Sequence, residues 1–288
     1  MAVYKRSYQP YSGRLTPVRR RFLTLPRYSY QQLFSSKFFT GFFAICLLPS
    51  LVATLMIYFY HNATVLKALT IPVAELFPID ERFFLGLLTA QASIGFLLTA
   101  LIGPGLISPD LSNNALPLYL SRPFSRSQYV LGKMMVLAVL LSLITWIPSL
   151  LLFVLQSSMA GTEWFLKHKG VAVAILLSAA LWIVTVSLLA LALSAWVRWK
   201  PIAAAAMFGV FFAAAAFGEL INGVLYTKWG LLINLGEVLR TVWFWLFLEP
   251  GNNMIRIPVW SAALSVAATC GLCLWMLGRK IRAYEVVR

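Results

Sequence analysis

Residues 170–197 read GVAVAILLSAALWIVTVSLLALALSAWV, and these 28 residues contain no charged side chain. A helix of about 20 apolar residues is long enough to cross the hydrocarbon core of a bilayer. The rest of the chain has the same character, since 60% of all residues are apolar and only 11% are charged. Soluble domains contain about 25% charged residues. The composition therefore predicts a polytopic membrane protein.

Apolar runs of similar length lie on both sides of this stretch. The six predicted spans are about 38–60, 83–107, 130–155, 170–197, 202–218 and 258–278. We expect an all-α transmembrane fold, a six-span helical bundle that occupies residues 38–278. A basic tail and an interfacial helix (1–37) precede this bundle, and a short cytoplasmic tail (279–288) follows it.

The distribution of charge predicts the orientation of the bundle. Basic residues concentrate in cytoplasmic segments of membrane proteins. Segments 1–37, 108–133, 198–201 and 279–288 together hold 17 Lys or Arg and 2 acidic residues, whereas segments 61–82, 156–169 and 219–257 hold 7 of each. Both termini are therefore expected in the cytoplasm, in a multi-pass plasma-membrane protein such as one of the bacterial inner membrane. Topology explains the net charge of +15, so we expect lipid and no nucleic acid as a partner.

Two segments are amphipathic and too polar to be spans. Tyr30, Leu33 and Phe34 recur at helical spacing before the first span, which predicts a short helix in the inner interface. Leu231–Leu248 carries Glu237 and Arg240 near its centre, where a charge costs about 2.5–3.5 kcal/mol at mid-bilayer. We expect this segment to lie in the outer interface, within a long outer connection (219–257), with Trp243 and Trp245 at the headgroup level.

The predicted spans lack the residues that catalysis and ion coupling need. No predicted span core contains His or an acidic residue, and such residues mark ion pathways. The chain has no G-x-x-x-x-G-K-[ST] phosphate loop and no catalytic or metal-binding constellation, so we expect no catalytic, cofactor or metal site and no enzyme activity. Gln91 is the one strongly polar side chain within a span core. Gln91 and Thr99 are candidates to line a transport path, and hydrogen bonding between helices is the alternative.

Residues 116–133 read LPLYLSRPFSRSQYVLGK and connect two predicted spans on the basic side. Pro117 and Pro123 interrupt helix formation. Ser125 and Gln128 have the spacing of a capping box, which predicts a new helix there, with a hydrophobic staple from Phe124 and Tyr129. Lys133 is expected to extend to the inner membrane surface, and a short helix is expected to start near Ser108-Pro109-Asp110. The pattern predicts a rigid cytoplasmic turn.

This stretch resembles the intracellular loop of permease subunits of type-2, exporter-like ABC transporters. The resemblance rests on a leucine-rich run, Ser121-Arg122-Pro123, a second Ser-Arg pair and Leu-Gly-Lys133. Family members often carry acidic residues and Gly-Thr-Leu before this run, where this chain has Ser112-Asn-Asn-Ala-Leu116. By position, the resemblance implies a docking or coupling role for Asp110, Asn113, Asn114, Ser121, Arg122, Pro123 and Arg126.

The resemblance also implies partners. It implies a second permease subunit, identical or different, and a separate ATP-binding-cassette ATPase that holds ATP and Mg²⁺ and drives export. Two other functions remain open from the residues alone. One is a non-transport membrane scaffold or assembly subunit, and the other is an ion-coupled secondary carrier, for which no polar mid-span site is found.

Overall fold

The computed structural model describes residues 23–62, 78–113, 125–197, 199–248 and 255–281. The helices within these ranges are α1 (Thr24–Phe34), α2 (Lys37–Ile45), α3 (Leu48–His61), α6 (Glu81–Ile102), α7 (Pro104–Ser112), α9 (Arg126–Ile144), α10 (Trp146–Ala160), α11 (Thr162–Trp196), α12 (Lys200–Leu225), the 3₁₀ turn η2 (Trp229–Leu232), α13 (Leu235–Phe247) and α14 (Val259–Lys280). The described part of the chain contains no β-strand, so the all-helical prediction is confirmed.

Six helical stretches are long and apolar enough to cross a membrane, as predicted. They are Lys37–His61, Glu81–Ser112, Arg126–Ala160, Thr162–Trp196, Lys200–Leu225 and Val259–Lys280. The first three are each interrupted once, and Pro49, Pro104 and Pro148 lie at or just after the interruptions. Proline has no backbone N–H and its ring displaces the preceding turn, so these three spans bend or break where a proline occurs.

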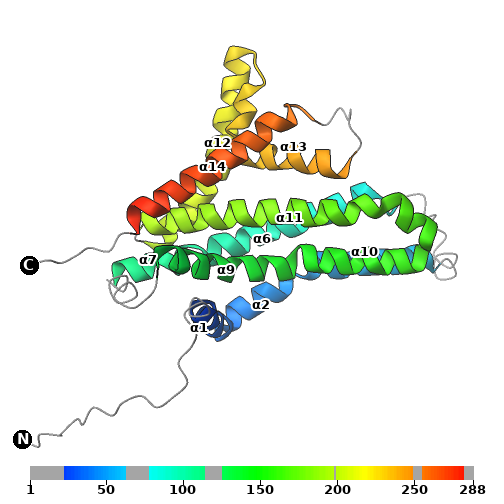
Figure 1. Ribbon diagram of the computed structural model, residues 1–288, viewed down its shortest axis with the longest axis horizontal. Coiled ribbons are helices and arrows are strands. Elements are labelled where there is room, and N and C mark those ends of the chain that lie inside the picture. Colours follow the sequence, from blue (N-terminus) through cyan, green and yellow to red (C-terminus); the bar gives the residue numbers. More distant parts are fainter. Residues whose placement is uncertain (1–22, 63–77, 114–124, 198, 249–254, 282–288) are drawn as a thin grey trace, which may run out of the picture.

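Helix α11 forms the centre of the bundle. It packs against α6, α7, α9, α10 and α14, and 61% of its most apolar stretch is buried. The corresponding value for α12 is 11%, and the C-terminal part of α12 projects away from the rest of the bundle (Figure 1). This helix ends at Leu225, seven residues beyond the predicted end at residue 218. Within this extension, Asn222 Oδ1 accepts a hydrogen bond from the N–H of Gly230 in η2.

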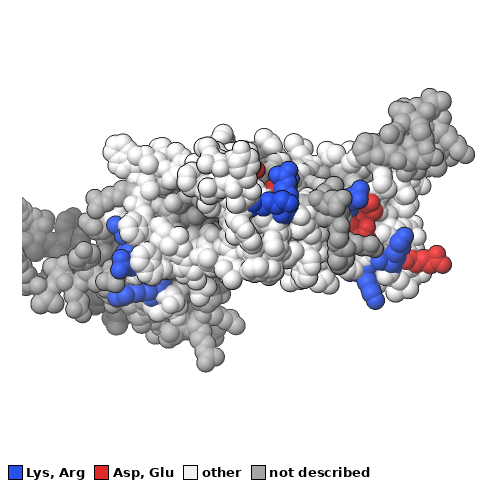
Figure 2. Space-filling model, turned by 90° about the horizontal axis from the view of Figure 1, so that it is seen from above, with Lys and Arg blue, Asp and Glu red and all other residues white. Residues whose placement is uncertain are grey.

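The two ends of the bundle differ in charge. At the end that holds α7 and the start of α9, the described residues include seven Lys or Arg and one acidic residue, Asp110. The other described charged residues, six Lys or Arg and five acidic residues, lie between the middle of the bundle and its opposite end. Figure 2 shows this contrast on one face, where basic side chains lie without acidic ones at one end, and together with acidic ones in the middle and at the other end. The contrast follows the positive-inside pattern, and the cytoplasmic assignment stays a prediction.

Helix α1 lies against α9 outside the spans. The Tyr30 hydroxyl donates hydrogen bonds to the backbone carbonyls of Met135 (3.0 Å) and Val136 (3.3 Å). Burial raises the pKa of Tyr30 from its ordinary value of 10 to about 12, because the phenolate would lose its hydration. The side chain of Ser36 then caps α2 by accepting a hydrogen bond from Phe39 N. The location of α1 in a membrane interface stays a prediction.

The predicted outer amphipathic segment forms η2 and α13, and α13 packs against α6, α11 and α14. Leu235, Val238 and Leu239 are buried on its inner face, as their spacing indicated. The expectation for Trp243 was wrong, because this indole is buried and its Nε1–H donates to the carbonyl of Ser178 at 3.2 Å. Trp245 is exposed and therefore free to contact the headgroup region.

Candidate functional site: the connection between α7 and α9

The connection begins where α6 ends, at Gly103-Pro104. Gly103 N donates to Thr99 O at 2.7 Å, and α7 starts at Pro104, the next residue. A Cβ atom on Gly103 would lie 2.7 Å from the Cβ of Ala190 in α11. Glycine is therefore required for the junction of α6 and α7 to lie directly against α11.

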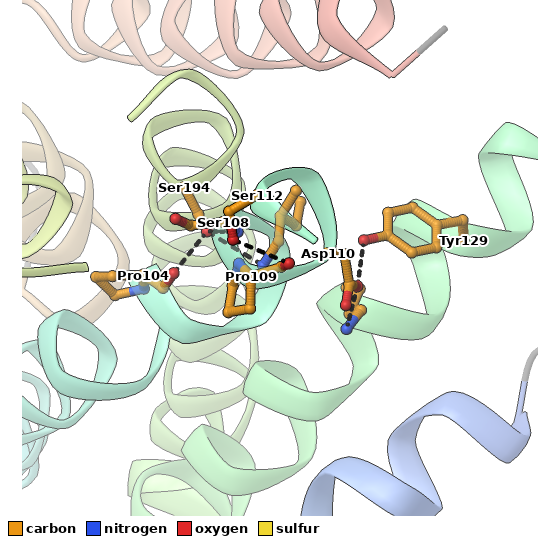
Figure 3. A network of polar contacts seen from close by, with 9 residues as sticks. Pro104, Ser108, Pro109, Asp110, Ser112, Tyr129 and Ser194 are labelled. Carbon is orange, nitrogen blue, oxygen red and sulfur yellow. Dashed lines mark hydrogen bonds and ion pairs between the residues drawn. The ribbon is translucent and has the colours of Figure 1, made fainter. Parts of the chain in front are cut away.

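Ser194 of α11 holds the first turn of α7 (Figure 3). Its hydroxyl donates to the carbonyl of Pro104 at 3.0 Å. The same oxygen accepts hydrogen bonds from the backbone N–H groups of Ile107 (3.1 Å) and Ser108 (3.0 Å). Ser194 is fully buried, so water cannot replace these bonds. A side chain from another helix thus adds hydrogen bonds to three backbone groups in the first turns of α7.

Asp110 joins α7 to α9. Its Oδ2 atom accepts a hydrogen bond from the Tyr129 hydroxyl at 2.7 Å and lies 2.8 Å from Lys133 Nζ. Tyr129 and Lys133 are four residues apart and share one face of α9, and Nζ lies 5.7 Å from the Tyr129 ring centroid. The Lys133 and Asp110 side chains are only 9% and 17% exposed. These three residues, the Asp110 cluster, form a nearly buried ion pair with a hydrogen-bonded hydroxyl (Figure 3 labels Asp110 and Tyr129).

The start of α9 is stabilised by the predicted capping box. Ser125 Oγ accepts a hydrogen bond from Gln128 N at 3.2 Å, and Gln128 Oε1 accepts one from Ser125 N at 3.0 Å. This prediction is confirmed. Residues 114–124 are therefore preceded by a helix that is bonded to α11 and α9, and are followed by a helix with a fully formed cap.

The sequence-predicted site residues divide into two groups. Asn114, Ser121, Arg122 and Pro123 lie outside the described residues, as does Phe124 of the expected staple. Three are described: Asp110 lies in the cluster, Asn113 ends α7 and is exposed, and Arg126 is the exposed first residue of α9. The docking role of all seven stays a prediction.

Comparison with known proteins supplies no identity. No protein-family model matches this chain, and no curated protein matches it. Any function must therefore be argued from the residues and their geometry.

Two expectations about this connection were wrong. Lys133 is buried against Asp110 rather than extended to the membrane surface, because a carboxylate lies within reach on the neighbouring helix. The helix expected to start near Ser108 begins at Pro104, because the chain resumes helical geometry immediately after the break. The dipeptide Gly103-Pro104 was the available signal, since Gly and Pro together mark a break. The role of Ser194 had no local signal.

The polar residues within the spans connect helices. Gln91 of α6 is fully buried, and its Nε2 donates to Ser50 Oγ of α3 at 2.9 Å. Ser149 of α10 donates to Gln91 Oε1 at 2.8 Å. The hydrogen-bonding alternative for Gln91 is therefore present, while Thr99 donates to Gly95 O within its own helix. The path-lining role of both residues stays a prediction. In the described residues, no group of three or more His, Cys, Asp or Glu could hold a metal.

Proposed function

We propose that this chain is the membrane-spanning permease subunit of a type-2 ABC transporter, which exports a substrate with energy from a separate ATPase subunit. The observation that carries the proposal is that the helices on both sides of residues 114–124, α7 and α9, are bonded to the rest of the protein. This segment, which contains Ser121-Arg122-Pro123, lies between two helices that are bonded to the bundle at its basic end. A segment so held can transmit a force applied to it.

The bonds of α7 and α9 provide the route by which a force applied to residues 114–124 would reach the spans. Packed helices move as units because protein interiors are dense. A push on residues 114–124 acts on α7, and the hydrogen bonds of Ser194 pass it to α11. The ion pair of Asp110 and Lys133 passes it to α9. The break at Gly103-Pro104 separates α7 from α6, so α7 can turn relative to the longer helix. Rigid-body motion of this kind underlies alternating access.

The proposal assigns the chemistry to a partner. The chain has no phosphate-binding loop, so ATP and Mg²⁺ are bound by the ATPase subunit. Arg122 and Arg126 are the proposed contacts with that subunit, and Asp110 acts by shaping the connection through Lys133. A second permease subunit, identical or different, completes the membrane half. The orientation follows from the charge of the two ends, with both termini in the cytoplasm of a cell with a bacterial-type inner membrane.

Co-purification separates this proposal from a membrane scaffold of the same fold. Affinity purification of the tagged chain from its native membrane in mild detergent should retain an ATP-binding-cassette ATPase in stoichiometric amount. Identification of the retained subunits by mass spectrometry reads this out. A chain that retains other membrane proteins and no such ATPase is a scaffold.

Charge reversal tests the docking residues. The double variant Arg122→Glu/Arg126→Glu should lose the ATPase while it inserts and folds normally, because Arg126 is exposed and neither residue is a member of the Asp110 cluster. Lys200→Glu is the matched control, since Lys200 is an exposed base at the same end of the bundle, at the start of α12. Retention of the ATPase by the double variant would refute the docking assignment.

A further inference from the structure

Two apolar grooves run along α6, one on each side of an exposed ridge. The first lies between α3 and α6, measures about 550 Å³ and is lined on the α3 side by Leu48, Val52 and Met56. The second lies between α6 and α13, measures about 450 Å³ and is lined on the α13 side by Phe244 and Leu248. Both volumes fall within the range of about 300–1,000 Å³ that is typical of ligand sites.

The ridge between the grooves consists of Arg82, Gly86 and Ala90, which line both grooves. These residues are four apart and therefore lie on one face of the helix. Gly86 and Ala90 keep the ridge low, and a Cβ atom on Gly86 would meet no atom within 4 Å. One molecule can therefore place a branch on each side of the ridge.

Arg82 is the charged residue at the point where the grooves meet. Among the described residues its guanidinium forms no ion pair. The two acidic residues before it have other partners: Asp80 Oδ1 caps α6 by accepting from Arg82 N and Phe83 N, and Glu81 Oε1 lies 3.5 Å from His168 Nε2. Neither carboxylate belongs to the described lining of the two grooves. Arg82 is therefore the one charged residue among the described residues that line the two grooves.

The length of the first groove matches one leaflet. Its lining on α6 extends from Arg82 to Ile94, and twelve residues of helix rise about 18 Å. Half of the roughly 30 Å hydrocarbon core is about 15 Å. A chain that starts at the level of Arg82 therefore reaches the bilayer midplane at the inner end of the groove.

We propose that this ridge binds one two-chain phospholipid with an anionic headgroup. The phosphate pairs with Arg82, and one acyl chain lies in each groove. Two diverging apolar grooves with a single cation at their junction fit this shape, whereas a single-chain amphiphile would leave one groove empty. The inference is independent of any ATPase partner, because it concerns α3, α6 and α13 alone.

Native mass spectrometry of the full-length chain tests the headgroup contact. Phosphatidylglycerol and phosphatidylcholine with identical chains are added to the delipidated protein in detergent. We expect the anionic lipid to bind more tightly, and Arg82→Gln to weaken it about fivefold, which corresponds to about 1 kcal/mol for one basic residue. Arg256→Gln is the matched control, because Arg256 is exposed and lies outside both grooves. Equal affinities for both lipids in wild type and Arg82→Gln would overturn the proposal.

Gly86→Leu tests the grooves. The new side chain meets open space, so the variant should fold, but it fills the area between the grooves. We expect binding of both lipids to weaken about tenfold, which is the effect of roughly two methylene groups left unburied.

Photoreactive phosphatidylglycerol, labelled in one chain or the other, tests the arrangement of the chains. One label should attach to α3 and the other to α13. Attachment of both labels to α3 alone would refute the two-groove arrangement. If the protein forms a dimer that buries these grooves and binds no lipid there, the occupant is a second copy of this chain and the proposal is wrong.

Discussion

Replacing Lys133 with methionine tests the Asp110 cluster. Lys133→Met keeps a long side chain and removes its charge, so Asp110 loses the Nζ atom 2.8 Å away and retains the Tyr129 hydroxyl. Removal of one partner from a buried ion pair costs about 3–5 kcal/mol. The Asp110 side chain is 17% exposed, and water can partly solvate it. We therefore expect a loss near the lower end, about 3 kcal/mol of unfolding free energy.

Reversible unfolding of the purified chain in micelles, followed by tryptophan fluorescence, measures this loss. Arg126→Met is the matched control, because Arg126 is an exposed base on the same helix. Exposed substitutions of this kind usually change stability by less than about 0.5 kcal/mol. Amide hydrogen exchange should also become faster at the start of α9 in Lys133→Met and stay unchanged in the control.

A double-mutant cycle shows whether the charge or the packing matters. Asp110→Asn added to Lys133→Met leaves no unpaired buried charge, so the double variant should cost less than the sum of the two single changes. The reasoning is refuted if Lys133→Met costs no more than Arg126→Met, or if the two single changes add without coupling.

Three further changes test other contacts. Ser194→Ala should cost about 1–3 kcal/mol, because it removes the three buried hydrogen bonds that join α11 to the first turns of α7, and hydrogen exchange of Ile107 and Ser108 should be faster; unchanged exchange would contradict this role. Gly103→Ala should cost about 1–3 kcal/mol through overpacking against Ala190, measured by the same unfolding assay, and a neutral result would show that the junction can move apart. The neutral form of Tyr30 is favoured when α1 is docked, since its pKa is raised to about 12. Docking should therefore be complete below pH 10 and lost as the pH rises through about 12, as monitored by tyrosinate absorbance against Tyr30→Phe; ionisation of this residue near pH 10 would refute it.

The sequence predicted the features that depend on local patterns. The six apolar stretches follow from runs of uncharged residues such as 170–197, because length and polarity alone decide whether a helix can span a bilayer. The capping box of Ser125 and Gln128 was also predictable, since both partners lie within one turn. The buried face of α13 followed from helical spacing in the same way.

The contacts between distant residues could not be predicted. Lys133 was expected at the surface because a lone Lys near a helix end usually extends there, and its partner Asp110 is 23 residues away on another helix. Ser194 carries no local signal that it holds α7. Trp243 has the amphipathic character of a headgroup residue, but the acceptor for its indole N–H is a carbonyl of α11. In each case the partner is determined by helix packing, which one sequence does not specify.

ATP hydrolysis in proteoliposomes tests the central claim most directly. The ATPase subunit that co-purifies with this chain is reconstituted alone, with the wild-type chain and with Arg122→Glu/Arg126→Glu. The permease assignment predicts that turnover depends on the wild-type chain and falls to the level of the ATPase alone with the double variant. Equal turnover in all three preparations would show that this chain does not couple to an ATPase, and would contradict the assignment.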